Sequence, residues 1–524
     1  MNQRYFHLLH LPALALRERH NRGDSPSTGM ARLGSPIIWL LVAAPFTMVD
    51  LFTMGVNHTL AQTDSSSPTQ KASKPSAASA SADPSRTSTP ASNNGGIVLT
   101  PDQKRAREAF LAGKWEEALQ ILEATAKATP TNPMPPKVLL ARWCAEAGQM
   151  AQARSWLEQA ARDDPKHPEV FLTNGHFAFL EGRITDTILN CQAALEVLDT
   201  PRWEATYKQQ VRMQARLGLA AAYEARRDFL NAYTHLREIL QTDPRNAPLR
   251  QRLARLLFLL NRTDEALQQW HQAQRDDPTL EPAELQLAQL YIARHEFDQA
   301  EAWFQKAVAC HSQDVRVRRL FAVFLLERGR LKEARSHLEV VQRLEPDSRD
   351  TRALTGYFAR HERNYPAAVK IFEELVRDYP SFPFALVNLS LLLAESGDGR
   401  GKERAIALAE NYVRQQPMHA DARAVLAYTL LQAGREVEAE RVARSALGLS
   451  LLSPDGAYFL AKVLQARGAS DEARTLVQAA LNNKDPMFYR QEAEELARKL
   501  GPDPASSKKG TAPSSSDSKN KKQP

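Results

Sequence analysis

The sequence has little cysteine: its 524 residues include only Cys144, Cys191 and Cys310. The three are odd in number, widely spaced and without a Cys-x-x-Cys pair. This excludes a complete disulfide framework and gives no zinc pattern. We interpret them as small buried residues of helices.

Catalytic signatures are absent. The sequence contains no His-Glu-x-x-His, Gly-x-Ser-x-Gly, Gly-x-Gly-x-x-Gly or Walker A motif. Neighbouring carboxylates such as Asp163 and Asp164 stand just before a proline, where they are typical of helix ends rather than of acid–base pairs. We therefore predict no enzyme, no cofactor and no metal site. Outside the 34-residue repeat that dominates the chain, no segment is long enough for a catalytic module.

A long hydrophobic run is also missing. The apolar stretch Pro36–Val49 has fourteen residues and continues less cleanly to Val56 across Asp50. It is shorter than the roughly 20 residues that span a bilayer, but it suits a signal-peptide core. A basic segment, residues 1–34, precedes it, and Met30 is an alternative start. We expect residues 35–61 to be a signal peptide or a membrane anchor that places the remainder outside the cytoplasm, with a cytoplasmic protein as the alternative.

The central part of the chain, residues 101–500, has no strong excess of positive or negative charge. The net charge is +7, but residues 1–100 and 501–524 carry most of it, and the body between them is near neutral. A near-neutral body argues against a nucleic-acid surface. Residues 62–100 and 501–524 are rich in Ser, Ala, Pro or Lys, a composition that predicts a disordered linker and a disordered tail.

A repeat of 34 residues dominates the rest of the chain. A period of this length indicates stacked structural units. An anchor residue, nearly always alanine, marks eleven units: Ala118, Ala153, Thr187, Ala232, Ala266, Ala300, Ala334, Ala368, Ala405, Ala439 and Ala473. A small residue precedes ten of the anchors by twelve positions and Ala405 by fifteen: Ala106, Ala141, Gly175, Ala220, Ala254, Ala288, Ala322, Gly356, Ser390, Ala427 and Ala461.

The pattern within each unit predicts two helices of about 12–14 residues joined by a short turn. The turn lies five residues before the anchor, as at Asn261, His295 and Gly329, and a proline closes most units. We expect the small residue and the anchor to lie where the two helices come closest, because a larger side chain would push them apart. A single unit cannot bury its own apolar face, so neighbouring units must cover it.

This pattern resembles the tetratricopeptide repeat (TPR), which has small residues in both helices, glycine in the turn, alanine late in the second helix and a closing proline. The resemblance covers residues 101–486. It implies an all-α, right-handed α-solenoid of about eleven repeats. We expect residues 487–500 to form a capping helix, as a solenoid end requires.

Two irregularities interrupt the spacing. Eleven extra residues around Pro201–Val211 precede the fourth unit, and their composition predicts a longer first helix. Three extra residues in Gly397–Gly401 predict a flexible turn.

The resemblance also implies a function. In such arrays the first helices line an inner groove that binds protein or peptide partners. Carried over to this sequence, the groove comprises His176, Phe179, Arg255, Phe258, Arg319, Tyr357, Arg360, Tyr428, Tyr458 and Lys462. We expect a non-enzymatic interaction scaffold of the bacterial envelope or exported type. The alternative is a structural subunit of a polysaccharide export or envelope secretion machine.

Overall fold

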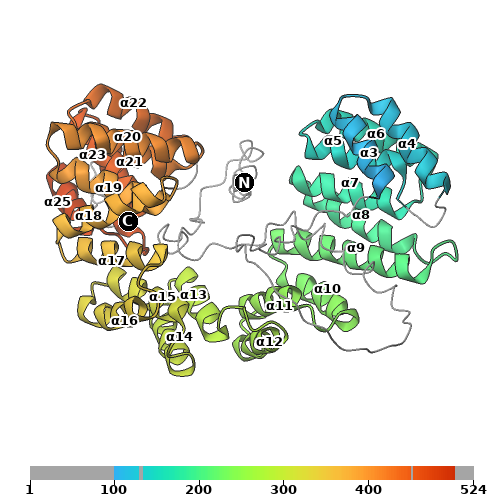
Figure 1. The fold of residues 1–524 in the computed structure, drawn as a ribbon, viewed down its shortest axis with the longest axis horizontal. Coiled ribbons are helices and arrows are strands. Elements are labelled where there is room, and N and C mark those ends of the chain that lie inside the picture. Colours follow the sequence, from blue (N-terminus) through green and yellow to red (C-terminus); the bar gives the residue numbers. More distant parts are fainter. Residues whose placement is uncertain (1–99, 129–133, 450–451, 502–524) are drawn as a thin grey trace, which may run out of the picture. The chain divides into compact units, whose positions relative to one another are not determined.

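The computed structural model describes residues 100–128, 134–449 and 452–501, which form 23 helices and no strand (Figure 1). The predicted all-α class is confirmed. The expected signal or anchor segment, residues 35–61, lies outside the described residues, as do most of the linker and tail. Within the described ranges, no helix combines the length and apolar character needed to cross a membrane.

The chain divides into two compact units, whose described parts lie within residues 100–278 and 279–501. The first unit contains five helix pairs: α3 (Pro101–Leu111) with α4 (Trp115–Ala128), α5 (Pro136–Glu146) with α6 (Met150–Asp163), α7 (Pro168–Leu180) with α8 (Ile184–Glu196), α9 (Ala205–Ala225) with α10 (Phe229–Thr242), and α11 (Ala247–Leu259) with α12 (Thr263–Asp276).

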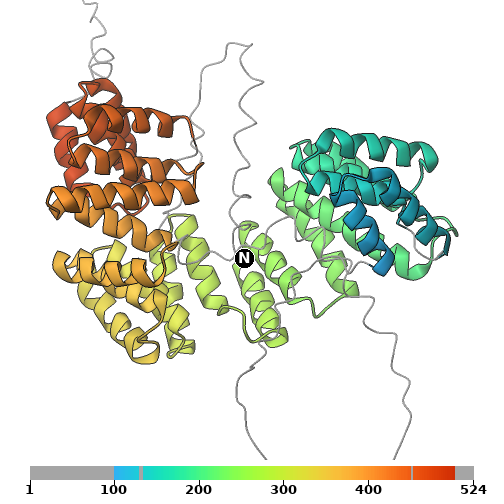
Figure 2. The same cartoon turned by 45° about the horizontal axis from the view of Figure 1, so that its top comes forward.

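The second unit contains six helix pairs and a closing helix: α13 (Ala283–Ala293) with α14 (Phe297–Cys310), α15 (Val315–Glu327) with α16 (Leu331–Leu344), α17 (Arg349–His361) with α18 (Tyr365–Asp378), α19 (Pro383–Ser396) with α20 (Gly399–Gln415), α21 (Ala420–Gln432) with α22 (Glu436–Leu447), α23 (Pro454–Ala466) with α24 (Ser470–Asn482), and finally α25 (Arg490–Leu500). The same cartoon in a second orientation shows the pairs stacking in chain order within this unit (Figure 2).

The turn inside a pair needs a left-handed residue. Gly329 has a φ of 74°, and the equivalent His295 has a φ of 57° although it is not glycine. A residue with positive φ ends a helix because it cannot continue the right-handed path, and glycine adopts it with no steric cost. The predicted turn positions are therefore confirmed at these two units.

The helix crossings are as tight as the small residues predict. The anchor Ala300 and its partner Ala288 are both 0% exposed. A Cβ atom added to Gly356 would lie 3.0 Å from Cζ of Phe372 and 3.1 Å from Cγ2 of Ile371, closer than side chains ordinarily pack. The hydrophobic core thus runs between the two helices of each pair and on to the next pair.

The length of α9, the connection between α19 and α20, and the burial of the cysteines can be compared with the sequence predictions. The extra residues before the fourth unit do lengthen its first helix, since α9 has 21 residues. The expected turn at Gly397–Gly401 is shorter than predicted: only Gly397 and Asp398 separate α19 from α20, because the Asp398 side chain accepts a hydrogen bond from the Gly401 amide at 2.8 Å and caps α20. Cys144 and Cys191 are buried as expected, but Cys310 is exposed because it ends α14.

The segment before the closing helix also differs from expectation. Helix α25 begins at Arg490, so Met487, Phe488 and Tyr489 do not belong to it. The backbone amides of Phe488 and Tyr489 donate to the Asp455 carboxylate, and the Tyr489 carbonyl accepts the first hydrogen bond of α25, so Tyr489 is the N-cap residue of that helix.

Candidate functional site

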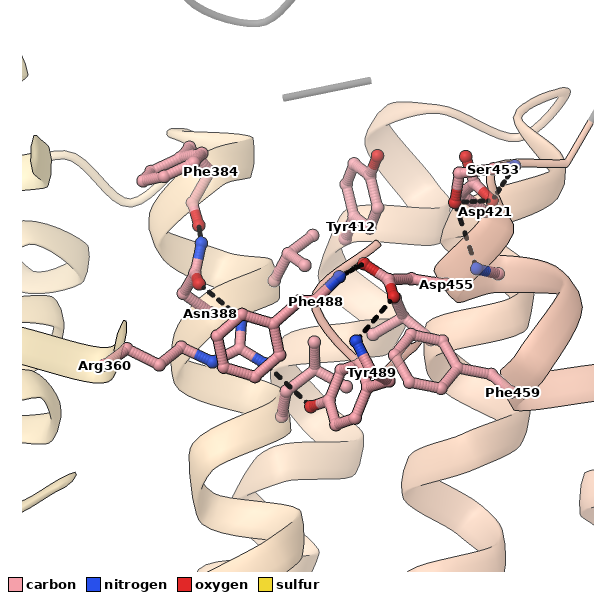
Figure 3. A pocket seen from close by; sticks show the side chains of 14 residues that line it. Arg360, Phe384, Asn388, Tyr412, Asp421, Ser453, Asp455, Phe459, Phe488 and Tyr489 are labelled. Atoms are coloured by element: carbon pink, nitrogen blue, oxygen red, sulfur yellow. Dashed lines mark hydrogen bonds between the residues drawn. The ribbon is translucent and has the colours of Figure 1, made fainter. Parts of the chain in front are cut away.

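A small polar pocket lies in the second unit, where the first helices α17, α19, α21 and α23 contribute side chains to one space (Figure 3). Its free volume is about 80 Å³. The segment between α24 and α25 reaches into it. The side chains that shape its chemistry are Arg360, Asn388, Asp421, Asp455, Phe488 and Tyr489.

Arg360, near the end of α17, is the central cation of this pocket. It is 4% exposed. One terminal nitrogen donates to Oδ1 of Asn388 at 2.8 Å, and the other donates to the Tyr489 hydroxyl at 2.6 Å. The guanidinium also lies 4.0 Å from the centroid of the Phe488 ring. These contacts hold the planar group in one orientation, as a recognition site requires.

Tyr489 bridges the cation to a carboxylate. Its hydroxyl accepts from Arg360 and donates to Oε1 of Glu395, on α19, at 2.5 Å. Its ring stacks on Tyr458 with centroids 5.6 Å apart and lies edge-on to Phe459 at 5.0 Å. Burial raises the pKa of the Tyr489 phenol well above its ordinary value. The phenol is therefore neutral at physiological pH and can both donate and accept.

Several buried carboxyl groups surround this pair. Burial raises the pKa of Asp455 to about 6, even though the Tyr489 and Phe488 amides and Arg360 oppose the shift. Burial likewise raises the pKa of Asp485 to about 6. Glu327, at the end of α15, has a pKa raised to about 8 by burial, with the nearby Asp455 and Asp485 adding to the shift. At physiological pH Asp455 and Asp485 are largely ionised and Glu327 is largely protonated, and the two ionised carboxylates disfavour a further anion here.

In the first unit, the equivalent faces of α5 and α7 carry a smaller polar group. Arg142 donates to Oε2 of Glu169 at 2.6 Å and to the Thr173 hydroxyl at 3.0 Å. Burial, with Arg142 adding to the effect, lowers the pKa of His176 to about 4, so this imidazole is neutral at physiological pH. The group stabilises the contact between neighbouring first helices, and Arg142 has its partners within it.

The ten residues predicted for the groove divide between the two units. His176, Phe179, Arg255 and Phe258 lie in the first, and the other six in the second. Arg255 is exposed, whereas His176, Arg319 and Lys462 are half-buried. The remaining six are 1–6% exposed: Phe179, Phe258, Tyr357, Arg360, Tyr428 and Tyr458.

These six side chains are therefore largely buried within the protein itself. The physical reason is that neighbouring first helices pack side by side, so aromatic rings on their inner faces fill the contact between them. The structure does bring Arg360, Tyr428 and Tyr458 together around Tyr489. Their role in binding a partner stays a prediction.

Several residues in or beside the pocket are absent from the predicted groove. Asp455 and Glu395 stand on inner faces of first helices, at places in the repeat that the family uses for its groove, so the register alone could have suggested them. Tyr489 and Asp485 carry no such signal, because they lie outside the repeating pattern.

Comparison with known families decides the assignment. Tetratricopeptide repeat models match residues 109–172 and 223–279, residues 285–349, 325–383 and 397–450, and residues 454–479. Together they cover more than half of the chain. The chain belongs to the tetratricopeptide repeat family. TPR units generally act as interaction modules rather than as catalysts, and no enzyme family is indicated.

Solved structures with low sequence identity also match this TPR chain. Yeast Tom70 has 14% identity and a TM-score of 0.36, over 76% of this chain and 94% of that one. The Cut9–Hcn1 hetero-tetramer of the APC/C has 14% identity and a TM-score of 0.37, over 75% and 95%. A thermophilic TPR protein of Thermus thermophilus has 18% identity and a TM-score of 0.31, over 36% and 98%. No curated protein matches the sequence.

Proposed function

We propose that this protein is a non-enzymatic scaffold that binds a protein or peptide partner along the inner faces of its first helices. The family supports the general role, because TPR units typically bind proteins. One observation supports the place: four successive first helices of the second unit direct polar and aromatic side chains into a single pocket (Figure 3). Arginine and tyrosine are among the side chains enriched at binding hot spots.

The proposal includes an exported context. Its support is the apolar stretch that comes after a basic segment near the N-terminus, together with the Ser/Ala/Pro-rich residues 62–100. The polysaccharide-export alternative gains no support from the matched families.

A pull-down from the native extract, with the full chain as bait, tests the binding role. The structure shows which residues can be replaced without damage to the core. Tyr357 is unsuitable because it is 2% exposed, and its removal would open a cavity. Arg255 is exposed and Lys462 half-buried, and both lie on first helices. We expect Arg255→Ala combined with Lys462→Ala to weaken capture of the partner by about tenfold, because interfacial cations can contribute about 1–2 kcal/mol.

The matched control is Gln268→Ala combined with Lys370→Ala, two exposed positions on the second helices α12 and α18. It should retain the partner. Both double variants should keep wild-type helicity and melting temperature, since none of the four side chains is buried. If the control loses the partner and the first-helix pair does not, the binding surface lies on the second helices and the proposed site is wrong.

A further inference from the structure

The segment Asn483–Tyr489, between α24 and α25, spans the inner face of the second unit. At one end, Oδ1 of Asp485 lies 3.4 Å from Nδ1 of His295, in the turn between α13 and α14. At the other end, Phe488 lies edge-on to His361 of α17, with ring centroids 5.0 Å apart. Asp485 and Tyr489 are 4% and 5% exposed. The segment is not helical, and its buried residues are Asp485 and Tyr489.

The backbone of this segment makes the same hydrogen bond to an aspartate as the connection between the two preceding repeats. One unit earlier, Asp421 accepts from the Ser453 amide at 3.0 Å, and Ser453 caps α23. Asp455 stands at the same place in the next unit and accepts from the Tyr489 amide at 3.0 Å. The side chains at these two equivalent positions make different contacts. Ser453 stays with Asp421, whereas Tyr489 reaches back to Arg360, 129 residues earlier.

We propose that Phe488 and Tyr489, with Asp485 held beside His295, form an intramolecular plug, and that the pocket occupied by the two aromatic side chains binds an extended peptide of a partner protein that carries a phenylalanine–tyrosine pair. This inference rests on the proposed function, because it names the kind of partner and how access to the site is controlled. The plug and the partner peptide exclude each other, since only about 80 Å³ remains free beside the plug.

The chemistry of the pocket selects an unmodified tyrosine. The hydroxyl must accept from Arg360 and donate to Glu395, as that of Tyr489 does. A phenylalanine in place of this tyrosine has no hydroxyl and makes neither hydrogen bond. A phosphotyrosine would place about two negative charges beside Glu395 and Asp455, and charge repulsion would exclude it. The preceding phenylalanine has a defined place too, beneath the Arg360 guanidinium and against His361.

The plug can be opened by substitution without loss of the closing helix. Tyr489 is the N-cap residue of α25, and serine is a favoured N-cap residue. The variant Phe488→Ala with Tyr489→Ser therefore empties the pocket while it preserves the start of α25. A milder variant, Tyr489→Phe, removes only the hydroxyl and keeps the ring in place.

The test uses a fluorescent synthetic peptide with the sequence of residues 483–490 and the full chain, with anisotropy as the readout. A tethered segment competes at an effective concentration in the millimolar range. We expect the opened variant to bind the peptide at least about tenfold more tightly than the wild type, with Tyr489→Phe between them. Circular dichroism checks that each variant keeps its helix content.

A double-mutant comparison then identifies the tyrosine contact. In the opened variant, Glu395→Ala should weaken the tyrosine peptide about tenfold, as expected for a hydrogen bond to a charged group, and leave a phenylalanine version unchanged. Glu410→Ala, an exposed carboxylate on the second helix α20, is the matched control and should change neither. The phosphotyrosine peptide should not bind at all.

Two results would overturn the plug. One is equal binding of the peptide to wild type and to both folded variants, because the segment would then not occupy the site. The other is no binding to either folded variant. Neither result bears on capture of the natural partner, which the Arg255 and Lys462 variants test. If the Arg255 and Lys462 variants lose the natural partner but the peptide binds none of the folded proteins, the proposed function stands and only the plug is refuted.

Discussion

Glu327 shows at the scale of one residue how burial sets the electrostatics of the second unit. Both of its carboxylate oxygens are buried, and neither has a hydrogen-bond partner among the described residues. Asp455 and Asp485 raise its pKa further, and Arg328 opposes them. A buried, unpartnered carboxylate is costly, so the protonated acid is the form that suits the fold.

We predict that stability falls as pH rises from about 6.5 to about 8. In the unfolded chain a glutamate is already ionised in this range, because its pKa is about 4.3. In the folded chain Glu327 has a pKa of about 8. The folded state thus holds more protons, and its advantage is lost as pH rises through that value. Buried histidines such as His361, with a pKa of about 4, change stability only below this window.

Thermal unfolding, monitored by circular dichroism at several pH values across this window, measures the effect. We expect the melting temperature of the wild type to fall by about 2–5 °C across the series. Glu327→Gln, a neutral isostere, should flatten the slope and be the more stable protein at the alkaline end. Equal slopes for the two proteins would mean that another group titrates.

At the scale of an element, the helix pair depends on a close approach between two small residues. Ala300 on α14 and Ala288 on α13 are both fully buried. Ala302, two positions further along α14, is exposed on the same helix. The two alanines of α14 therefore separate the cost of bulk at the crossing from any effect of leucine on the helix itself.

We predict that Ala300→Leu destabilises the protein by roughly 1–3 kcal/mol, because the added atoms overpack the crossing with α13. Ala302→Leu should change stability by less than about 0.5 kcal/mol, as surface substitutions usually do. Urea unfolding of both variants provides the comparison. An Ala300→Leu protein as stable as the control would show that the repeat register is wrong.

At the scale of the whole molecule, the described chain is two compact units with separate clusters of buried side chains. In a repeat array each unit contacts mainly its neighbours, so stability is close to a sum of local terms. The export hypothesis rests instead on residues 1–61, which carry the basic segment and the apolar stretch.

We predict that the repeats are exported. Positive charge before an apolar segment favours a cytoplasmic N-terminus and transfer of the downstream chain across the membrane. A reporter that is active only after export, fused behind residue 96, should be active, and its matched cytoplasmic counterpart should be inactive. The reverse pattern would refute export. N-terminal sequencing of the mature protein would then distinguish a cleaved signal peptide, with a new end near Ala61, from a retained anchor.

Much of the fold was predictable because its determinants are local and repeated. An anchor such as Ala300, a turn residue such as His295 and a closing proline recur within one 34-residue unit, so each unit supports the interpretation of the next. The groove was predictable only in part. A helical pattern gives the face on which Tyr357 or Tyr428 lies, but it does not give how closely the neighbouring helix approaches that face.

By itself, the sequence determined that this is an all-α array of paired helices with small residues at their crossings, since those contacts recur at a fixed separation. Only the tertiary structure decided that Tyr489 meets Arg360, 129 residues earlier, and that Asp485 lies beside His295. These contacts occur once, between residues outside any period. They depend on how the stacked helices of the second unit curve around a shared inner face, which is a property of all their crossings together and of no single repeat.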